Sequence, residues 1–242
     1  MPKEYPNGTV VATHQHLRAQ LIYATSGVIE VTVHRSLWLV PPQLALWMPP
    51  EVPHRMLARG NVSLRTAYVH PDACPASFPL RPRIVRVSPL LRELIARAAT
   101  IPLNPDPAGR DSLVITHMLA EIEWAPEQSL RLPCGSDRRL RRICDAILAA
   151  PSDSRTLDEW AREVGASTRT LSRLFIAETG VSFVIWRQLA RIQCALPLLA
   201  SGVPVASVGT QLGYETASAF AAMFRRFTGT TPQAYVRLSD PA

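Results

Sequence analysis

Val164-Gly-Ala-Ser-Thr-Arg-Thr-Leu-Ser-Arg-Leu-Phe175 and Leu212-Gly-Tyr-Glu-Thr-Ala-Ser-Ala-Phe-Ala-Ala-Met-Phe224 are two copies of one pattern near the end of this 242-residue chain. In each copy an apolar helical stretch reaches a tight turn at a Gly, and polar residues then start a second helix. Another Gly, at 180 and at 229, follows five residues after the closing Phe. This order is typical of a helix-turn-helix, and it decides the fold of the carboxy-terminal part.

The spacing of the two copies predicts how they act together. The second helix of a helix-turn-helix can lie in the major groove of DNA. A long helix predicted over 182–200 joins the copies and would span roughly 27 Å at 1.5 Å per residue. This length approaches one turn of DNA, roughly 34 Å, so we expect the two copies to enter successive grooves on one face of a duplex. Pro197 should kink this helix or weaken its last turn.

The first copy supplies the stronger candidates for base contacts. Ser167 caps its second helix, and Thr168, Arg169, Ser172 and Arg173 are polar positions near the start of that helix. An Arg side chain can donate to guanine O6 and N7 together. The alternative is a pair of solvated arginines on an ordinary helix.

The second copy offers fewer long donors. Thr216, Ala217 and Ser218 are predicted to meet thymine methyl groups or mostly the DNA backbone. Arg225 and Arg226, at the far end of the helix, suit phosphates, which give affinity without sequence information. A solvated basic helix end, favoured by the helix dipole, is the alternative.

Beyond these residues, the chain resembles the AraC/XylS family of bacterial transcription regulators over about residues 138–238. The resemblance implies a module of seven helices whose two reading helices enter adjacent major grooves. Three departures from the family pattern reduce the base reading expected of the second copy. Ala222 stands where most members have an Arg. Val236 stands where an Arg commonly follows the final aromatic residue, although Arg237 is beside it, and Pro197 is unusual in the joining helix. The matching positions are the alternating run from Gly165 to Phe175, Gly180, Arg191, Ala195, Leu199, Gly213, Tyr214, Phe220, Phe224 and the stretch 229–232.

The amino-terminal half reads as short strands near 21–24, 28–33, 36–40, 45–48 and 63–69. Such a series predicts a β-barrel of the cupin or jelly-roll type. The fold class is therefore α+β: this barrel with two following helices, then an all-α domain with two helix-turn-helix motifs. We predict a cupin sensor domain over 1–125, a linker over 126–136 and the DNA-binding domain over 137–242.

Two predicted helices, 88–100 and 111–124, follow the barrel and carry apolar stripes. The family resemblance implies that this region forms a homodimer. The alternative is that both helices simply cover the barrel.

Three histidines of the barrel stand in cupin-like spacing. His14 and His16 precede Gln20, which replaces the usual Glu, and His54 ends a second motif. Imidazoles at i and i+2 of a strand face one side, and a third from a neighbouring strand can complete a divalent metal site. Many regulator cupins instead bind an organic effector without metal, so no cofactor is certain. Tyr23, Trp38 and Trp47 are candidates for lining that site, although core packing is their default role.

The composition of the chain bears on the cellular compartment in which we expect it. No run of about 18 apolar residues exists, so no membrane partner is expected, and the start of the chain lacks a signal peptide. The four cysteines show neither paired nor metal-type spacing, which favours a reduced, cytoplasmic protein. The net charge is +7, and all but one of the 26 basic residues are Arg. Genomic codon bias explains that preference as well as DNA binding does.

We therefore expect a regulator that binds double-stranded promoter DNA, responds to a small molecule or a metal, and has RNA polymerase as a further partner. The barrel and helix pattern resembles a subgroup whose members control an efflux transporter. The rival hypothesis is a metal-dependent cupin enzyme, an oxygenase or isomerase, with an accessory helical domain. Gln20 in place of an acidic ligand argues against it.

Overall fold

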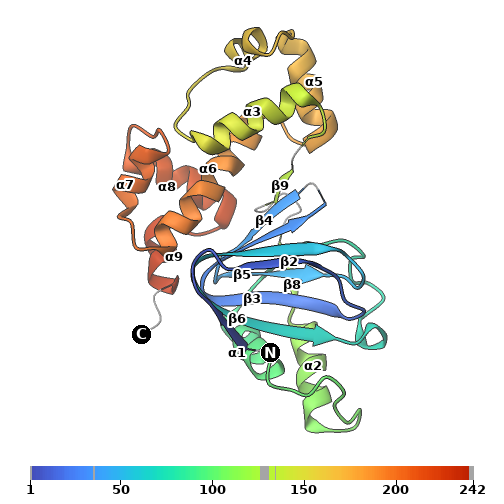
Figure 1. Ribbon diagram of the computed structural model, residues 1–242. Helices are drawn as coiled ribbons and strands as arrows, with labels where there is room; N and C mark the ends of the chain where they lie inside the picture. The colour runs from blue at the N-terminus through green and yellow to red at the C-terminus, as the bar shows by residue number, and fades with distance from the viewer. Residues whose placement is uncertain (1, 35, 126–130, 134, 240–242) are drawn as a thin grey trace. The chain divides into compact units, whose positions relative to one another are not determined.

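A computed structural model describes residues 2–34, 36–125, 131–133 and 135–239 (Figure 1). The chain forms two compact units. The first comprises 1–34, 39–129 and 237–242, and the second comprises 35–38 and 130–236. In the described part of the chain, no helix is both long enough and apolar enough to span a bilayer.

An antiparallel sheet forms the body of the first unit (Figure 1). Its strands follow the order β1-β6-β3-β5-β7-β8, and β2 also pairs with β6. The bounds are Pro2–Tyr5 for β1, Val10–His14 for β2, Ala19–Val33 for β3, Leu44–Met48 for β5, His54–Val69 for β6, Arg83–Arg86 for β7 and Glu123–Trp124 for β8.

The strands predicted over 21–24 and 28–33 are two parts of one bent strand, β3. The register of β3 against β6 shifts on both sides of Ser26. Gly27 follows with φ +69°, and a Cβ there would stand 2.7 Å from the carbonyl oxygen of Asn61. Only glycine combines this left-handed backbone with such a close approach, so Gly27 bends the long strand without ending its pairing.

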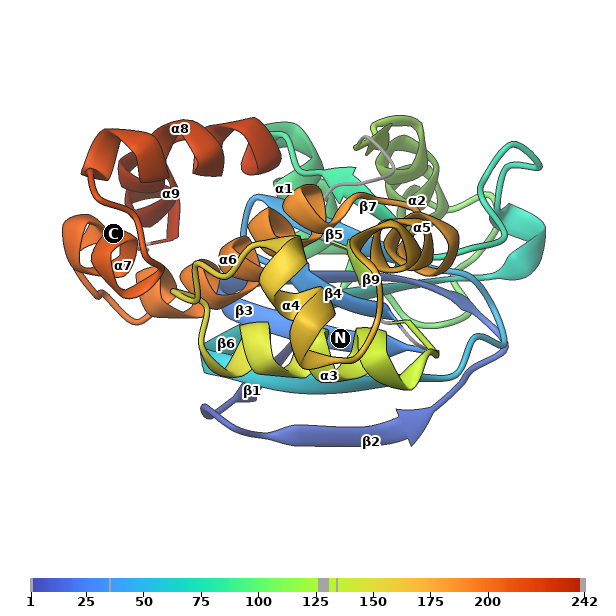
Figure 2. The ribbon, with the colours of Figure 1, turned by 90° about the horizontal axis from the view of Figure 1, so that it is seen from above.

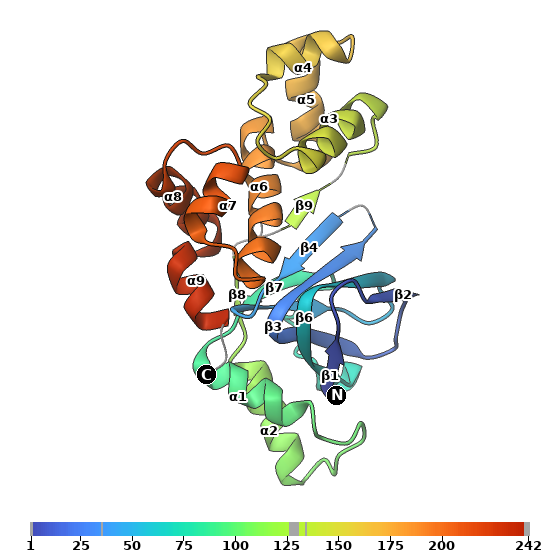
Figure 3. The same ribbon diagram turned by 60° about the vertical axis from the view of Figure 1, so that its left-hand side comes forward.

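Two helices pack on this sheet, α1 (Pro89–Ala98) and α2 (Arg110–Ala120), and they lie side by side (Figure 3). Leu91 and Ile95 of α1 share one apolar core with Met118 of α2 and with side chains of the sheet. The predicted helix over 111–124 is four residues too long. It ends at Ala120 because 123–124 pair with β7 as strand β8.

Helices α3 to α9 make up most of the described part of the second unit. A capping box starts α4: Thr156 accepts from the Glu159 backbone N–H while the Glu159 carboxylate accepts from the Thr156 N–H. Pro197 lies inside α6, as predicted. The bounds are Arg138–Ala149 for α3, Leu157–Glu163 for α4, Thr168–Thr179 for α5, Phe183–Ala200 for α6, Val205–Gln211 for α7, Ala217–Thr228 for α8 and Pro232–Ser239 for α9.

Helix α6 organises this unit, because it packs against α3, α5, α7 and α8. The pairs α4–α5 and α7–α8 lie at opposite ends of it (Figures 1 and 2). The mixed α+β architecture, a sheet domain followed by a helical domain with two helix-turn-helix motifs, is thereby confirmed.

The predicted linker over 126–136 falls partly on 126–130 and 134, which lie outside the described residues. Arg131–Pro133 form a short strand, β9, which pairs with Ser36–Trp38 of β4 (Ser36–Val40). Leu132 is fully buried in the helical core. These described linker residues therefore pack as part of the second unit.

Candidate functional site

The two helix-turn-helix copies share their turn geometry. Gly165 and Gly213 adopt left-handed backbones, with φ +67° and +78°, which glycine adopts at little cost. Ser167 and Thr216 then cap α5 and α8, each accepting a hydrogen bond from the backbone N–H three residues on. The same local chemistry therefore starts both reading helices, by which we mean α5 and α8.

The first reading helix, α5, has one buried and one exposed face. Leu171 and Phe175 are fully buried, whereas Arg169, Ser172 and Arg173 are exposed. Within the described part of the chain, neither arginine forms a side-chain hydrogen bond or an ion pair. Both guanidinium groups are consequently available to a partner from outside.

Two of the predicted DNA contacts on α5 already have intramolecular partners. The hydroxyl of Ser167 accepts from the Thr170 N–H at 3.1 Å. The hydroxyl of Thr168 donates to the carboxylate of Asp158 on α4. These side chains hold the turn and the helix start in place, which leaves Ser172 and the two arginines as the exposed polar side chains of that face without a partner among the described residues.

The second reading helix, α8, repeats the burial pattern without the arginines. Phe220 and Phe224 are fully buried, and Ala217 and Ser218 are exposed. The hydroxyl of Thr216 accepts from the Ala219 N–H at 3.2 Å and from the Ser218 hydroxyl. The exposed start of this helix therefore carries small side chains only.

Arg225 and Arg226 are exposed in the last turn of α8. The guanidinium of Arg226 lies 5.7 Å from the centre of the Phe227 ring. Arg225 makes no side-chain hydrogen bond or ion pair with any residue that the structure describes. Both positive charges stand at the opposite end of the helix from the turn.

Sequence reasoning predicted no role for two arginines of α6, Arg187 and Arg191, that tie the copies together. Arg191 donates to the carbonyl oxygen of Pro151 at 2.9 Å and stacks 5.1 Å from the ring centre of Tyr214. Arg187 donates to the carbonyl oxygen of Arg155 at 2.9 Å, and burial lowers the pKa of its guanidinium. Their spacing of four residues within an apolar helix was the available signal, because charged groups on a buried stripe need partners.

In the first unit, the three predicted metal ligands come together. His14, His16 and His54 each offer a ring nitrogen, and these atoms lie within 4.8 Å of one another. The ring centres of His14 and His54 are 4.4 Å apart. The antiparallel pairing of β2 with β6 brings them together, because it sets His14 opposite His54. We call these three residues the imidazole cluster.

Each ring of the imidazole cluster is oriented by a backbone carbonyl two residues away. The Nδ1 atoms of His14, His16 and His54 lie 2.9, 2.5 and 2.8 Å from the carbonyl oxygens of Ala12, Arg18 and Val52. A proton on Nδ1 satisfies each carbonyl and leaves the Nε2 lone pair as the acceptor. A carbonyl on the far nitrogen is the usual partner of a metal-binding imidazole.

His54 and Gln20 complete the donor set. Burial, with smaller contributions from the two neighbouring imidazoles, lowers the pKa of His54 to about 4. Its Nε2 is buried without a hydrogen-bond partner among the described residues. The Nε2 of His16 lies 2.7 Å from the Gln20 side-chain oxygen. A cation held by both atoms would account for this short contact, as would a flipped amide or a proton on Nε2. Three imidazoles and an amide oxygen therefore fit a divalent transition metal.

The three aromatic candidates are buried in cores. Tyr23 and Trp47 belong to the core between the sheet and the helix pair, where the Trp47 indole donates to the carbonyl oxygen of Pro79 at 3.2 Å. Trp38 is also buried, and the guanidinium of Arg131 lies 5.8 Å from its ring centre. These contacts are packing contacts, and a role in binding a ligand stays a prediction.

Family models match both units. A model described as an AraC-like ligand binding domain matches residues 3–117, and one described as a helix-turn-helix domain matches residues 160–238. The two matches together cover most of the chain.

Individual proteins show the same likeness. The chain is 36% identical to the HTH-type transcriptional regulator NimR of Escherichia coli, over 92% of this chain and 81% of that protein. It is 33% identical to the arabinose operon regulatory protein of Escherichia coli, over 50% of this chain and 42% of that protein. Among solved structures, ToxT from Vibrio cholerae aligns with a TM-score of 0.43 at 10% identity, covering 100% of this chain and 97% of that one.

Proposed function

This chain belongs to the AraC family of transcriptional regulators, and from that premise we propose that it reads promoter DNA chiefly through α5, while α8 contributes mainly backbone contacts. The regulator hypothesis of the sequence analysis is confirmed, and the comparisons do not support the enzyme alternative. Control of an efflux transporter stays a prediction.

The free guanidinium groups of Arg169 and Arg173 carry this proposal. They are four residues apart on an exposed helix face, and neither has a partner among the described residues. Guanine is the base that best matches an arginine fork. The equivalent positions of α8, 49 residues further on, hold Ser218 and Ala222, which cannot make that contact.

Binding of full-length protein to a library of DNA sites tests the proposal. Arg169→Ala should cost about 1–3 kcal/mol at one base position and relax the preference there. Arg141→Ala is the matched control, because Arg141 is exposed on α3 of the same unit and outside both motifs. If Arg169→Ala and Arg141→Ala leave the base preference equally unchanged, Arg169 does not read bases.

Arg225→Ala probes the proposed backbone role of α8. Removal of one phosphate contact should weaken binding to every sequence alike and reduce the salt slope, log K against log salt, by about 1. Titrations at several salt concentrations measure this slope. A loss confined to particular sequences would contradict the proposed division of labour.

We also propose that the imidazole cluster binds a divalent metal ion through His14, His16 and His54, with Gln20 as a fourth donor. Such an ion would join strands β2, β3 and β6 and the loop that carries His16, so it could act as the sensed species or as a support for an effector. Metal analysis and calorimetry with zinc, cobalt or nickel test this, with His16→Ala abolishing binding. His117→Ala, on the exposed face of α2, is the control that should leave it intact.

The regulator is further proposed to work as a homodimer in the cytoplasm, with RNA polymerase as a partner. Leu90 on α1 and Leu113 on α2 support the dimer, because they are 55% and 59% exposed and are large and apolar. Sedimentation should show Leu113→Asp shifting the protein to monomer. An unchanged oligomeric state would remove α2 from the interface.

A further inference from the structure

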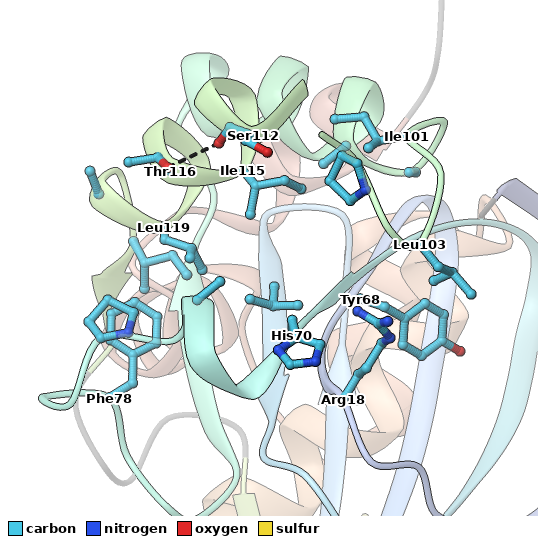
Figure 4. A pocket seen from close by; sticks show the side chains of 18 of the residues that line it. Arg18, Tyr68, His70, Phe78, Ile101, Leu103, Ser112, Ile115, Thr116 and Leu119 are labelled. Carbon is cyan, nitrogen blue, oxygen red and sulfur yellow. Dashed lines mark hydrogen bonds between the residues drawn. The ribbon is translucent and has the colours of Figure 1, made fainter. Parts of the chain in front are cut away.

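A cavity of about 620 Å³ lies between the sheet and the two helices of the first unit (Figure 4). Tyr68 and Val69 of β6 form one wall, and Ile115 and Leu119 of α2 form the opposite one. Leu103, in the loop between α1 and α2, closes a side. This volume is in the range of pockets that hold small organic ligands. None of the aromatic candidates Tyr23, Trp38 and Trp47 lines it.

The cavity lining contains a basic side chain and no acidic one. Most of the wall is aliphatic, aromatic or proline, and none of the lining residues is Asp or Glu. Arg18 reaches the cavity from the sheet side, beside Tyr68 and His70 (Figure 4). Its guanidinium donates to the neutral amide oxygen of Asn104 at 2.7 Å and forms no ion pair with a described carboxylate. An apolar chamber thus carries a positive charge without a counterion.

We propose that this cavity binds a small amphiphilic carboxylate, whose anionic head contacts Arg18 and whose apolar body lies between β6 and α2. A guanidinium matches a carboxylate in charge and in its two-pronged hydrogen bonding. The apolar walls favour an uncharged body, because burying it removes apolar surface from water. We take this cavity to be the effector site, and that assignment rests on the regulator function proposed above.

The cavity shares residues with the support of the imidazole cluster. The carbonyl oxygen of Arg18 is the partner of His16 Nδ1. Tyr68 accepts from the Gln20 amide at 3.4 Å, and its ring centre is 5.2 Å from that of His16. An occupant would therefore contact the residues that orient His16 on one side and helix α2 on the other. Such contacts can favour one arrangement of the domain over another.

Calorimetry on the full-length protein with three probes of one chain length tests whether the cavity prefers an anionic head group. Decanoate should bind at least tenfold more tightly than decylammonium, with decanol between them. Arg18→Gln should lower the affinity for decanoate at least tenfold. Arg86→Gln should leave it unchanged, since Arg86 is exposed on β7 and does not line the cavity.

Two tryptophan variants on α2 test whether decanoate binds in this cavity. Thr116 is exposed yet lines the cavity, so the indole of Thr116→Trp should occupy part of it and lower the affinity for decanoate at least tenfold without unfolding the protein. His117→Trp, the next residue of α2 and outside the lining, should bind decanoate as the parent does. Equal affinity for the three probes, no binding of any, or full binding by Thr116→Trp overturns the inference.

Promoter binding by the same preparations separates this inference from the proposed function. Protein that shifts promoter DNA but fails the decanoate tests overturns only the cavity assignment. Protein that binds decanoate through Arg18 but shifts no DNA overturns only the proposed function of the reading helices.

Discussion

The two helix-turn-helix copies have the same scaffold but expose different chemistry. In both, a left-handed Gly makes the turn, a hydroxyl caps the reading helix, and the apolar side chains four and eight positions after the cap are fully buried. On the exposed face, α5 presents Arg169 and Arg173 where α8 presents Ser218 and Ala222. This difference indicates that the residues shared by the two copies serve folding, whereas the exposed residues that would contact DNA differ from one copy to the other.

The largest effect should come from the shared core. Phe175 packs 5.3 Å from the ring centre of Phe183, and Phe224 packs 5.6 Å from that of Tyr235. Phe175→Ala and Phe224→Ala should each cost about 3–5 kcal/mol of unfolding free energy, because each leaves a cavity in a fully buried site. Denaturant unfolding measures both. A loss below about 1 kcal/mol in either would break the view that the two scaffolds are equivalent.

The turn glycines should show a smaller effect that differs between the copies. Gly165→Ala should cost about 1–2 kcal/mol, because alanine is strained at this left-handed φ although a Cβ would meet open space. Gly213→Ala should cost more, since a Cβ there would stand 2.9 Å from the carbonyl oxygen of Ser152. Unfolding curves of the two variants compare them directly. Equal losses would show that the backbone near Ser152 yields.

A gain on the weak face should be the smallest effect. Ala222→Arg places a guanidinium at the position that matches Arg173, so it should add about 1 kcal/mol of preference at one base pair. Site selection with the variant measures this. Ala206→Arg, exposed on α7, adds the same charge away from the reading face and should raise affinity for all sequences alike. Identical behaviour of the two variants would show that α8 lies outside the groove.

Local signals in the sequence predicted the helical unit well. Thr156 with Glu159, Ser167 and Pro232 each mark a helix start through chemistry within a few residues, and the structure places helix starts there. The spacing of His14 and His16 also marked the imidazole cluster, although β2 ends at His14 and His16 lies in the loop that follows, so strand alternation does not bring them together. His54 joined them on the strength of a second motif, and pairing of β2 with β6 places it opposite His14.

Contacts between elements far apart in the chain could not be predicted from the sequence. Strand β8 cut the second predicted helix short because 123–124 pair with β7, far back along the chain. Strand β9 lies within the predicted linker because it pairs with residues nearly a hundred positions earlier. Arg187 and Arg191 hold distant carbonyl groups, and nothing in their immediate neighbours marks those partners.

The sequence by itself determined the doubled reading motif and its helix caps, because turns and caps depend on residues a few positions apart. Only the tertiary structure decided that Arg18 meets the apolar walls of β6 and α2, and that Tyr68 stands between this chamber and His16. Such an arrangement depends on the packing of whole elements against one another, which brings together side chains up to a hundred residues apart.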